Sequence, residues 1–238
     1  MKWDYPVYDP EAGKKAEGTY SRAKRKAMTR EEAVAFIAGD DPRPLLVLRE
    51  CKVCNGTDEA LLKGGVDNEK TFLMSAWFHC VKLPVDVMEE DHPFHNLFVE
   101  EKPEHLFVVS VDGSNHQPLQ SQTSRTELWK SMKGLLEVEY DSKPDKPLKK
   151  INSLLDKLDA ADQRVRQYSE QRDKILEEDG PDSKKLPKLV KKLAKEEGEL
   201  AELRGEVDKA YRLELRRQKA EARAKAESEK EQPAGAGR

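Results

Sequence analysis

The spacing of apolar residues in the C-terminal part of the chain is the strongest constraint on its fold. From Leu148 onward they recur at alternating steps of three and four, the pattern of helices that pack along a narrow coiled-coil seam. Gly180-Pro181-Asp182 interrupts the pattern, and a second set begins at once. The two sets are Ile151, Leu154, Leu158, Ala161, Val165, Tyr168 and Ile175, then Leu186, Leu189, Leu193, Leu200, Leu203, Val207 and Ala210. A short break between two long amphipathic helices predicts an antiparallel coiled-coil hairpin.

Several positions of this hairpin are not optimised for a self-sufficient coiled coil. Arg172 and Glu196 fall on the seam, where Leu or Ile would be usual. Gly198 and Gly205 fall on the outer face, and each costs about 1 kcal/mol relative to Ala inside a helix. We therefore expect the hairpin to gain stability from another contact. The alternatives are a protein partner, a second copy of the chain in a homodimer, or the rest of this chain.

Residue types divide the chain near residue 141. All cysteines, histidines, tryptophans and phenylalanines precede it, so side-chain chemistry beyond charge is expected there. The sequence predicts an α/β head with a central mixed sheet and flanking helices, joined by a linker to the hairpin. The predicted parts are an irregular N-terminal arm (1–28), the head (29–140), the linker (141–147), the hairpin (148–227) and a disordered tail (228–238).

The predicted elements of the head alternate between helix and strand. Thr29 and Glu32 have the spacing of a capping box, which predicts a short helix after Thr29. The apolar run at residues 44–48 has the length of a strand buried on both faces. The remaining predicted elements are helices at 57–63 and 68–74, the second capped by Asn68, strands at 77–83 and 106–111, a polar hairpin segment, and a helix at 124–137.

A Cys51-Lys52-Val53-Cys54 motif follows the first strand and precedes a predicted helix. At such a position backbone N–H groups and the positive end of the helix lower the pKa of the first thiol, and the thiolate is the species that attacks a disulfide. Three cysteines do not form the even framework of a secreted disulfide scaffold. The motif is therefore expected to be catalytic, redox-sensing or metal-binding.

The order and spacing of these elements resemble the thioredoxin-like family over residues 29–140. The resemblance implies that Cys51 is the nucleophile and that Cys54 resolves the mixed disulfide. It implies that Pro103, just before the third strand, is cis and packs beside the CxxC; Pro93 is a weaker counterpart. It further implies a thiol–disulfide oxidoreductase or redox sensor without a cofactor, acting on protein dithiols or disulfides.

The motif differs from the familiar family pattern in its flanking residues. Glu50 stands where the family has a tryptophan, and its charge raises the pKa of the neighbouring thiol, whereas Lys52 lowers it. Leu45 occupies the position of the family's buried acid, six residues before the first cysteine. The break at Gly64-Gly65 resembles the subgroup whose first crossover is split.

Two other classes of function remain open at this point. The head is a degenerate thioredoxin fold in a non-enzymatic adaptor, with the hairpin binding a macromolecular assembly. Alternatively, Cys51, Cys54 and Cys80 hold a structural zinc ion together with His79, His92 or His95, since zinc takes four such ligands. Cys80 lies on a predicted core strand, where a free cysteine usually acts as a small hydrophobic residue.

Charge and hydropathy limit the partners. The formal net charge is −3, and the basic runs at 14–26 and 184–195 are more typical of solvated faces, so no nucleic-acid partner is expected. No run of about 18 apolar residues could span a bilayer, and the first residues lack a secretory signal. The sequence predicts a cytoplasmic protein with no membrane partner, docked to a protein through its hairpin.

Overall fold

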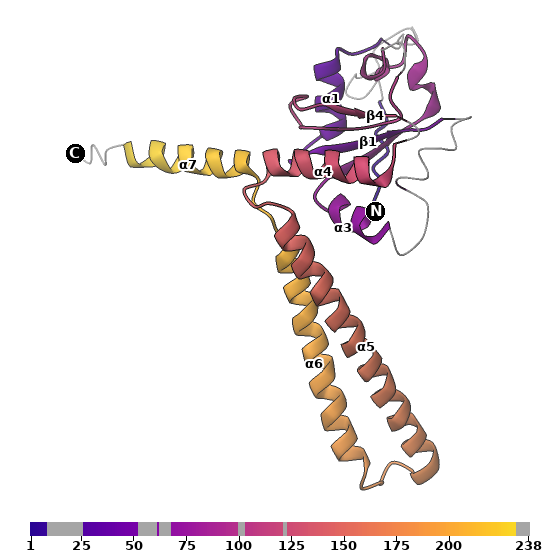
Figure 1. Ribbon diagram of the computed structural model, residues 1–238. Helices are drawn as coiled ribbons and strands as arrows, with labels where there is room; N and C mark the ends of the chain where they lie inside the picture. Colours follow the sequence, from indigo (N-terminus) through magenta and orange to yellow (C-terminus); the bar gives the residue numbers. More distant parts are fainter. Residues whose placement is uncertain (9–25, 52–60, 62–67, 100–102, 121–122, 232–238) are drawn as a thin grey trace, which may run out of the picture. The chain divides into compact units, whose positions relative to one another are not determined.

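A strand of five consecutive buried residues, β1 (Leu45–Arg49), lies at the centre of a four-stranded mixed sheet (Figure 1). The computed structural model describes residues 1–8, 26–51, 61, 68–99, 103–120 and 123–231. The strand order is β2-β1-β3-β4, with β2 at His79–Leu83, β3 at Leu106–Val109 and β4 at Gln117–Leu119. β1 pairs parallel to β2 and antiparallel to β3, and β4 is antiparallel to β3. The predicted α/β class is confirmed.

Helices cover both faces of this sheet. On one face, α1 (Arg30–Ala38) packs with apolar side chains of β1, β2 and β3 around a core that includes Phe94, Phe98 and Phe107. On the other face lie α3 (Glu69–Ser75) and α4 (Arg125–Glu139), joined by a hydrogen bond of 2.8 Å from the Trp129 indole to Thr71. Because both faces are covered, β1 reads as a continuous apolar run and not as an alternating one.

Local sequence signals account for the helix starts. The capping box predicted at Thr29 and Glu32 is confirmed, and Ser124 with Glu127 forms a second one ahead of α4. The predicted cap at Asn68 is wrong. Its side-chain amide donates instead to the carbonyl of Leu61 at 2.8 Å, so tertiary packing takes the group away from the helix end.

The first residues of the chain are not an irregular arm throughout. Asp4 pairs parallel with Val81, and its backbone exchanges hydrogen bonds of 2.8 Å with Cys80 and Lys82. This bridge covers the outer edge of β2, which would otherwise present unpaired backbone groups. Two short 3-10 helices, η2 (Val85–Met88) and η3 (His95–Leu97), connect β2 towards β3.

A pair of long helices forms a separate unit. The chain divides into one unit of Met1–Ser142 with Glu214–Arg238 and a second of Lys143–Leu213. In the second, α5 (Asp145–Asp179) and α6 (Leu186–Tyr211) run antiparallel along each other (Figure 1). The buried side chains between them fall on the predicted seam. They include Ile151, Leu154 and Ala161 on α5, and Leu189, Leu193 and Leu200 on α6.

The predicted boundary of the hairpin at residue 227 needs correction. The second helix of the pair ends at Tyr211, and a further helix, α7 (Arg216–Glu231), belongs to the unit of the head. Leu215 is buried, and Arg216 Nε donates to the carbonyl of Tyr140 at 2.8 Å. The predicted disordered tail therefore begins too early, since helix continues to Glu231. Among the described residues, no helix is long and apolar enough to cross a bilayer.

Candidate functional site

Cys51 lies at the carboxyl end of the central strand. β1 ends at Arg49, and Glu50 N–H still donates to Leu83 of β2 at 2.9 Å. Cys51 is half-buried and disulfide-bonded. The carboxyl ends of parallel strands in open α/β sheets are the usual place for functional groups. The remaining residues of the motif, Lys52, Val53 and Cys54, fall outside the described part of the chain.

The pairing of β1 with β3 ends close in sequence to both Cys51 and Pro103. Leu48 pairs with Leu106, and Arg49 N–H donates to the carbonyl of His105 at 2.8 Å. This hydrogen bond joins two residues at the end of the sheet, one two positions before Cys51 and the other two positions after Pro103. The bond before Pro103 starts at Lys102, outside the described residues. Among the described peptide bonds none is cis, so Pro93 is trans.

The acid beside Cys51 has a partner. Glu50 Oε1 lies 2.6 Å from Lys82 Nζ, and both side chains are partly exposed. An ion pair at this distance offsets the negative charge that the thiol experiences from Glu50. Lys82 on the adjacent strand β2 thus largely neutralises the charge of Glu50 beside Cys51.

A buried arginine lies two residues before Cys51. Arg49 is 7% exposed, and its Nε donates to the carbonyl of Glu104 at 3.2 Å. Its other contacts are the His105 Nδ1 at 3.4 Å and the ring of Phe98, whose centroid lies 5.5 Å away. Burial, and then the charge of Arg49, lower the pKa of His105, so this imidazole is neutral near pH 7.

A buried carboxylate accompanies this arginine. Glu104 is 1% exposed, and its Oε1 lies 2.9 Å from His116 Nε2, within ion-pair distance but outside hydrogen-bond alignment. Arg30 lies 4.0 Å away at the rim. Burial alone would raise the pKa of Glu104, but His116 and Arg30 lower it further than burial raises it. Glu104 is therefore ionised at neutral pH.

No local sequence pattern marks this cluster. Its members come from three segments of the chain: Arg49, Glu104 with His105, and His116. The only signal in the sequence is the polar pair that follows Pro103 and precedes an apolar strand. Leu45, six residues before Cys51, is fully buried and apolar. The cluster supplies a cation and an anion at the end of the sheet that carries Cys51. A nearby cation such as Arg49 favours the thiolate form of a cysteine.

Cys80 lies at the other end of the sheet. It pairs with Leu46, five residues before Cys51, which corresponds to roughly 16 Å along the strand. One zinc ion cannot span that separation with ligand distances near 2 Å. In the described part of the chain, no cluster of three or more His, Cys, Asp or Glu side chains suits a metal ion.

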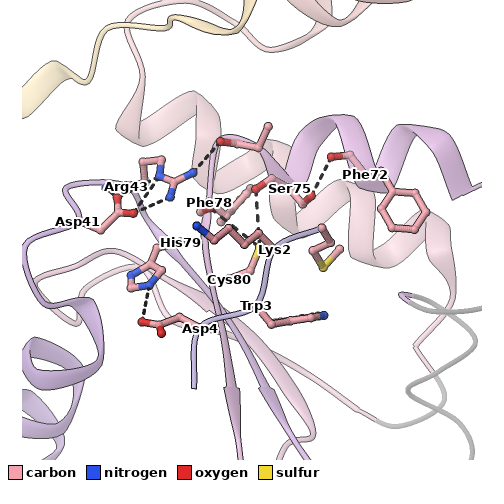
Figure 2. Close-up of a pocket in the computed structure, with 12 residues that line it drawn as sticks. Lys2, Trp3, Asp4, Asp41, Arg43, Phe72, Ser75, Phe78, His79 and Cys80 are labelled. Carbon is pink, nitrogen blue, oxygen red and sulfur yellow. Dashed lines mark hydrogen bonds and ion pairs between the residues drawn. The ribbon is translucent and has the colours of Figure 1, made fainter. Parts of the chain in front are cut away.

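Burial accounts for the state of the Cys80 thiol. The residue is 3% exposed and free, and its Sγ faces the carbonyl of Ser75 at 3.7 Å (Figure 2). Burial raises the pKa of the Cys80 thiol to about 12, with a small opposing effect of Arg43. A thiol in this state is protonated and inert near neutral pH.

A cavity of about 510 Å³, lined by both polar and apolar side chains, lies at this end of β2. Two ion pairs line it, Arg43 with Asp41 at 2.5 Å and His79 with Asp4 at 3.2 Å (Figure 2). His79 thus contacts a carboxylate of the N-terminal segment and does not join Cys80 at a common centre. The charged groups of the cavity are largely paired with one another, so they stabilise the edge of the sheet.

Fold and site together define an α/β head with Cys51 at the end of its central strand and a separate helical hairpin. Searches against family models, curated proteins and solved structures found no match for this chain.

Proposed function

We propose that this chain is a thioredoxin-like thiol–disulfide oxidoreductase or redox sensor, with Cys51 as the attacking sulfur and Cys54 as the resolving one. The observation that carries the proposal is the hydrogen bond from Arg49 to the carbonyl of His105 at the end of a buried central strand, two residues before Cys51 and two residues after Pro103. A proline there lacks the backbone N–H that would continue the strand pairing, and in this proposal an extended substrate segment binds beside it. The disulfide-bonded state of Cys51 is also consistent with it.

The reaction is a two-electron exchange. The Cys51 thiolate attacks one sulfur of a substrate disulfide, forms a mixed disulfide and releases the other substrate sulfur as a thiolate. The Cys54 thiolate then attacks the Cys51 sulfur and releases the second substrate thiolate. The chain ends oxidised, with a Cys51–Cys54 disulfide, and the substrate ends as a reduced dithiol. The reverse sequence oxidises a substrate dithiol.

The neighbouring charges have distinct parts in this scheme. Arg49 places a buried positive charge two residues from Cys51, which favours the thiolate. Lys82 neutralises Glu50, which would otherwise disfavour it. Glu104 with His116 forms a buried ion pair at this end of the sheet, whereas the position of Leu45 carries no charge.

Selective alkylation of the reduced protein tests the proposal. Cys51 should react with iodoacetamide at pH 7 well before Cys80, because the Cys80 thiol has a pKa of about 12 and a thiolate fraction near 10⁻⁵. A Cys54→Ser variant should accumulate mixed disulfides through Cys51, and Cys80→Ala should leave both results unchanged. Equal, slow labelling of Cys51 and Cys80 would eliminate the redox mechanism.

A non-enzymatic adaptor is the second candidate, and the fully buried Leu45 favours it because the usual buried acid is missing. In an adaptor the head binds a partner without cycling its cysteines. Titration in glutathione buffers separates the two candidates. An oxidoreductase has a measurable midpoint potential for its cysteine pair, and the Cys51→Ser variant, which lacks that pair, loses its function. An adaptor retains partner binding in that variant.

The antiparallel helices are, in this proposal, a coiled-coil docking hairpin that delivers the head to a protein partner. They contain no Cys, His or Trp, so they offer apolar seam and charge and no side-chain chemistry. A cysteine pair that cycles between dithiol and disulfide suits the reducing cytoplasm, where stable structural disulfides are rare.

A further inference from the structure

The outer face of α6 carries a stripe of charges that changes sign at its middle. Its members are Lys188, Lys191, Lys195, Glu199, Glu202 and Glu206, hereafter the bipolar stripe. They follow one another at steps of three or four residues, so they lie along one side of the helix. All six are exposed. Leu189, Leu193 and Leu200, which are buried, mark the opposite side, towards α5.

The bipolar stripe is almost unused within the chain. Glu199 lies 3.4 Å from Arg164 of α5. In the described residues the other five members have no ion-pair or hydrogen-bond partner. The three lysines repel one another, and so do the three glutamates, because like charges lie three or four residues apart. The stripe therefore contributes little to the stability of the isolated hairpin.

The stripe is complementary to a second copy of itself in antiparallel orientation. With a two-fold axis near Glu197, Lys188 meets Glu206, Lys191 meets Glu202, and Lys195 meets Glu199 of the other copy. A two-fold interface repeats each pair, which gives complementary charges along the whole stripe. Parallel alignment would instead place lysine against lysine. A phosphate backbone would meet three acids after three lysines, which disfavours nucleic acid.

Beside the stripe runs a row of small residues, each one position earlier in the sequence. Gly198 and Gly205 have no atom within 4 Å of the place where a Cβ would lie. Val190 is 48% exposed. In the same antiparallel register Val190 lies opposite Gly205 of the second copy, and Ala194 lies opposite Ala201. A large side chain thus faces a gap, which allows two helices to approach closely.

We propose that the occupant of this face is a second copy of this chain, docked antiparallel along α6 with the two-fold axis beside Gly198. The axis falls near the middle of α6 (Leu186–Tyr211), so the two helices overlap over their full length. The proposal commits the hairpin to self-association and is independent of the chemistry at Cys51. It also gives the two glycines on the outer face a function that offsets their cost in helix propensity.

Complementary charge reversal tests the proposal. In the acidic variant Lys188, Lys191 and Lys195 are changed to Glu; in the basic variant Glu199, Glu202 and Glu206 are changed to Lys. The unmodified full chain should sediment as a dimer at low salt and dissociate as salt screens the pairs, with a dissociation constant at least about tenfold higher in 0.5 M NaCl. Each variant alone should be monomeric. An equimolar mixture of the two should form a heterodimer, measured by native mass spectrometry.

A matched control changes the same number of exposed lysines on the other helix, Lys149, Lys150 and Lys157 to Glu, and should leave the dimer intact. Gly198→Leu should also abolish the dimer while preserving or raising helicity, because Leu is a better helix former than Gly. A monomeric full chain at low salt overturns the proposal. So does a dimer that survives both charge reversals, or a mixture of the variants that stays monomeric.

Discussion

At the scale of single residues, the most informative side chain is Glu104. A carboxylate that is 1% exposed would be costly without His116 and Arg30, whose charges lower its pKa. A group whose folded-state pKa is depressed stabilises the protein above its unfolded pKa of about 4.3. That contribution is lost as pH falls from about 4.3 through the lower pKa of the folded state. The stability of the head therefore decreases at acidic pH, because Glu104 becomes protonated.

We expect Glu104→Gln to destabilise the head by about 1 to 3 kcal/mol at pH 7, because the amide leaves His116 without its charge partner. The difference from the unmodified chain should shrink below pH 4. Urea unfolding at both pH values measures it, and Glu90→Gln, an exposed acid, is the control. A constant difference across this range would show that Glu104 contributes by packing alone.

At the scale of elements, the polar residue Glu196 on the seam of the hairpin has a charged partner on the facing helix. Glu196 is only 14% exposed, and its Oε2 accepts from Arg164 Nε at 2.6 Å. Arg172, the other polar seam residue, contacts its neighbour Asp173 on the same helix. Both are polar residues at seam positions where Leu or Ile would be usual, and the structure pairs their charges in different ways. Glu196 bridges the two helices, and Arg172 does not.

Replacing Glu196 by Leu is expected to stabilise the hairpin by about 1 kcal/mol. Burial of a leucine contributes about 1.5 to 3 kcal/mol, and the partly exposed ion pair with Arg164 contributes less than that. Hydrogen exchange of α5 and α6 in the full chain measures the change. Glu177→Leu, at an exposed position on α5, should slow exchange far less. Faster exchange in Glu196→Leu would mean that the ion pair outweighs apolar packing here.

At the scale of the whole molecule, the chain leaves the head at Ser142 and returns to it at Glu214. Asp141 N–H donates to the carbonyl of Glu214 at 3.1 Å, so the two crossing points are adjacent. Arg217 then donates to the carbonyl of Pro42 at 2.9 Å. The hairpin is therefore an insertion between two parts of the head, and it is not a terminal appendage.

Two deletions distinguish a hairpin inserted into the head from one appended after it. Replacing residues 143–213 with a short glycine linker should leave the unfolding free energy of the head and the alkylation rate of Cys51 nearly unchanged. Truncation after Ser142 should cost about 2 to 4 kcal/mol, because it removes buried Leu215 and the hydrogen bond from Arg216 to Tyr140. Thermal unfolding compares the two. Equal stabilities would mean that α7 contributes nothing to the head.

The sequence by itself determined those features that depend on neighbours along the chain. Apolar residues at alternating steps of three and four marked the two long helices, Thr29 with Glu32 marked a helix start, and an unbroken apolar run marked the central strand. It also identified Cys51 at the end of that strand. These signals are local, because helix caps, turns and side-chain periodicity act within a few residues.

Only the tertiary structure decided which distant groups meet. The strand register separated Cys51 from Cys80, and packing brought Glu104 to His116. The return of the chain to the head after Tyr211 likewise had no local signal. Such pairings arise because buried charges and unpaired strand edges require partners, and the sequence does not specify where along the chain those partners lie.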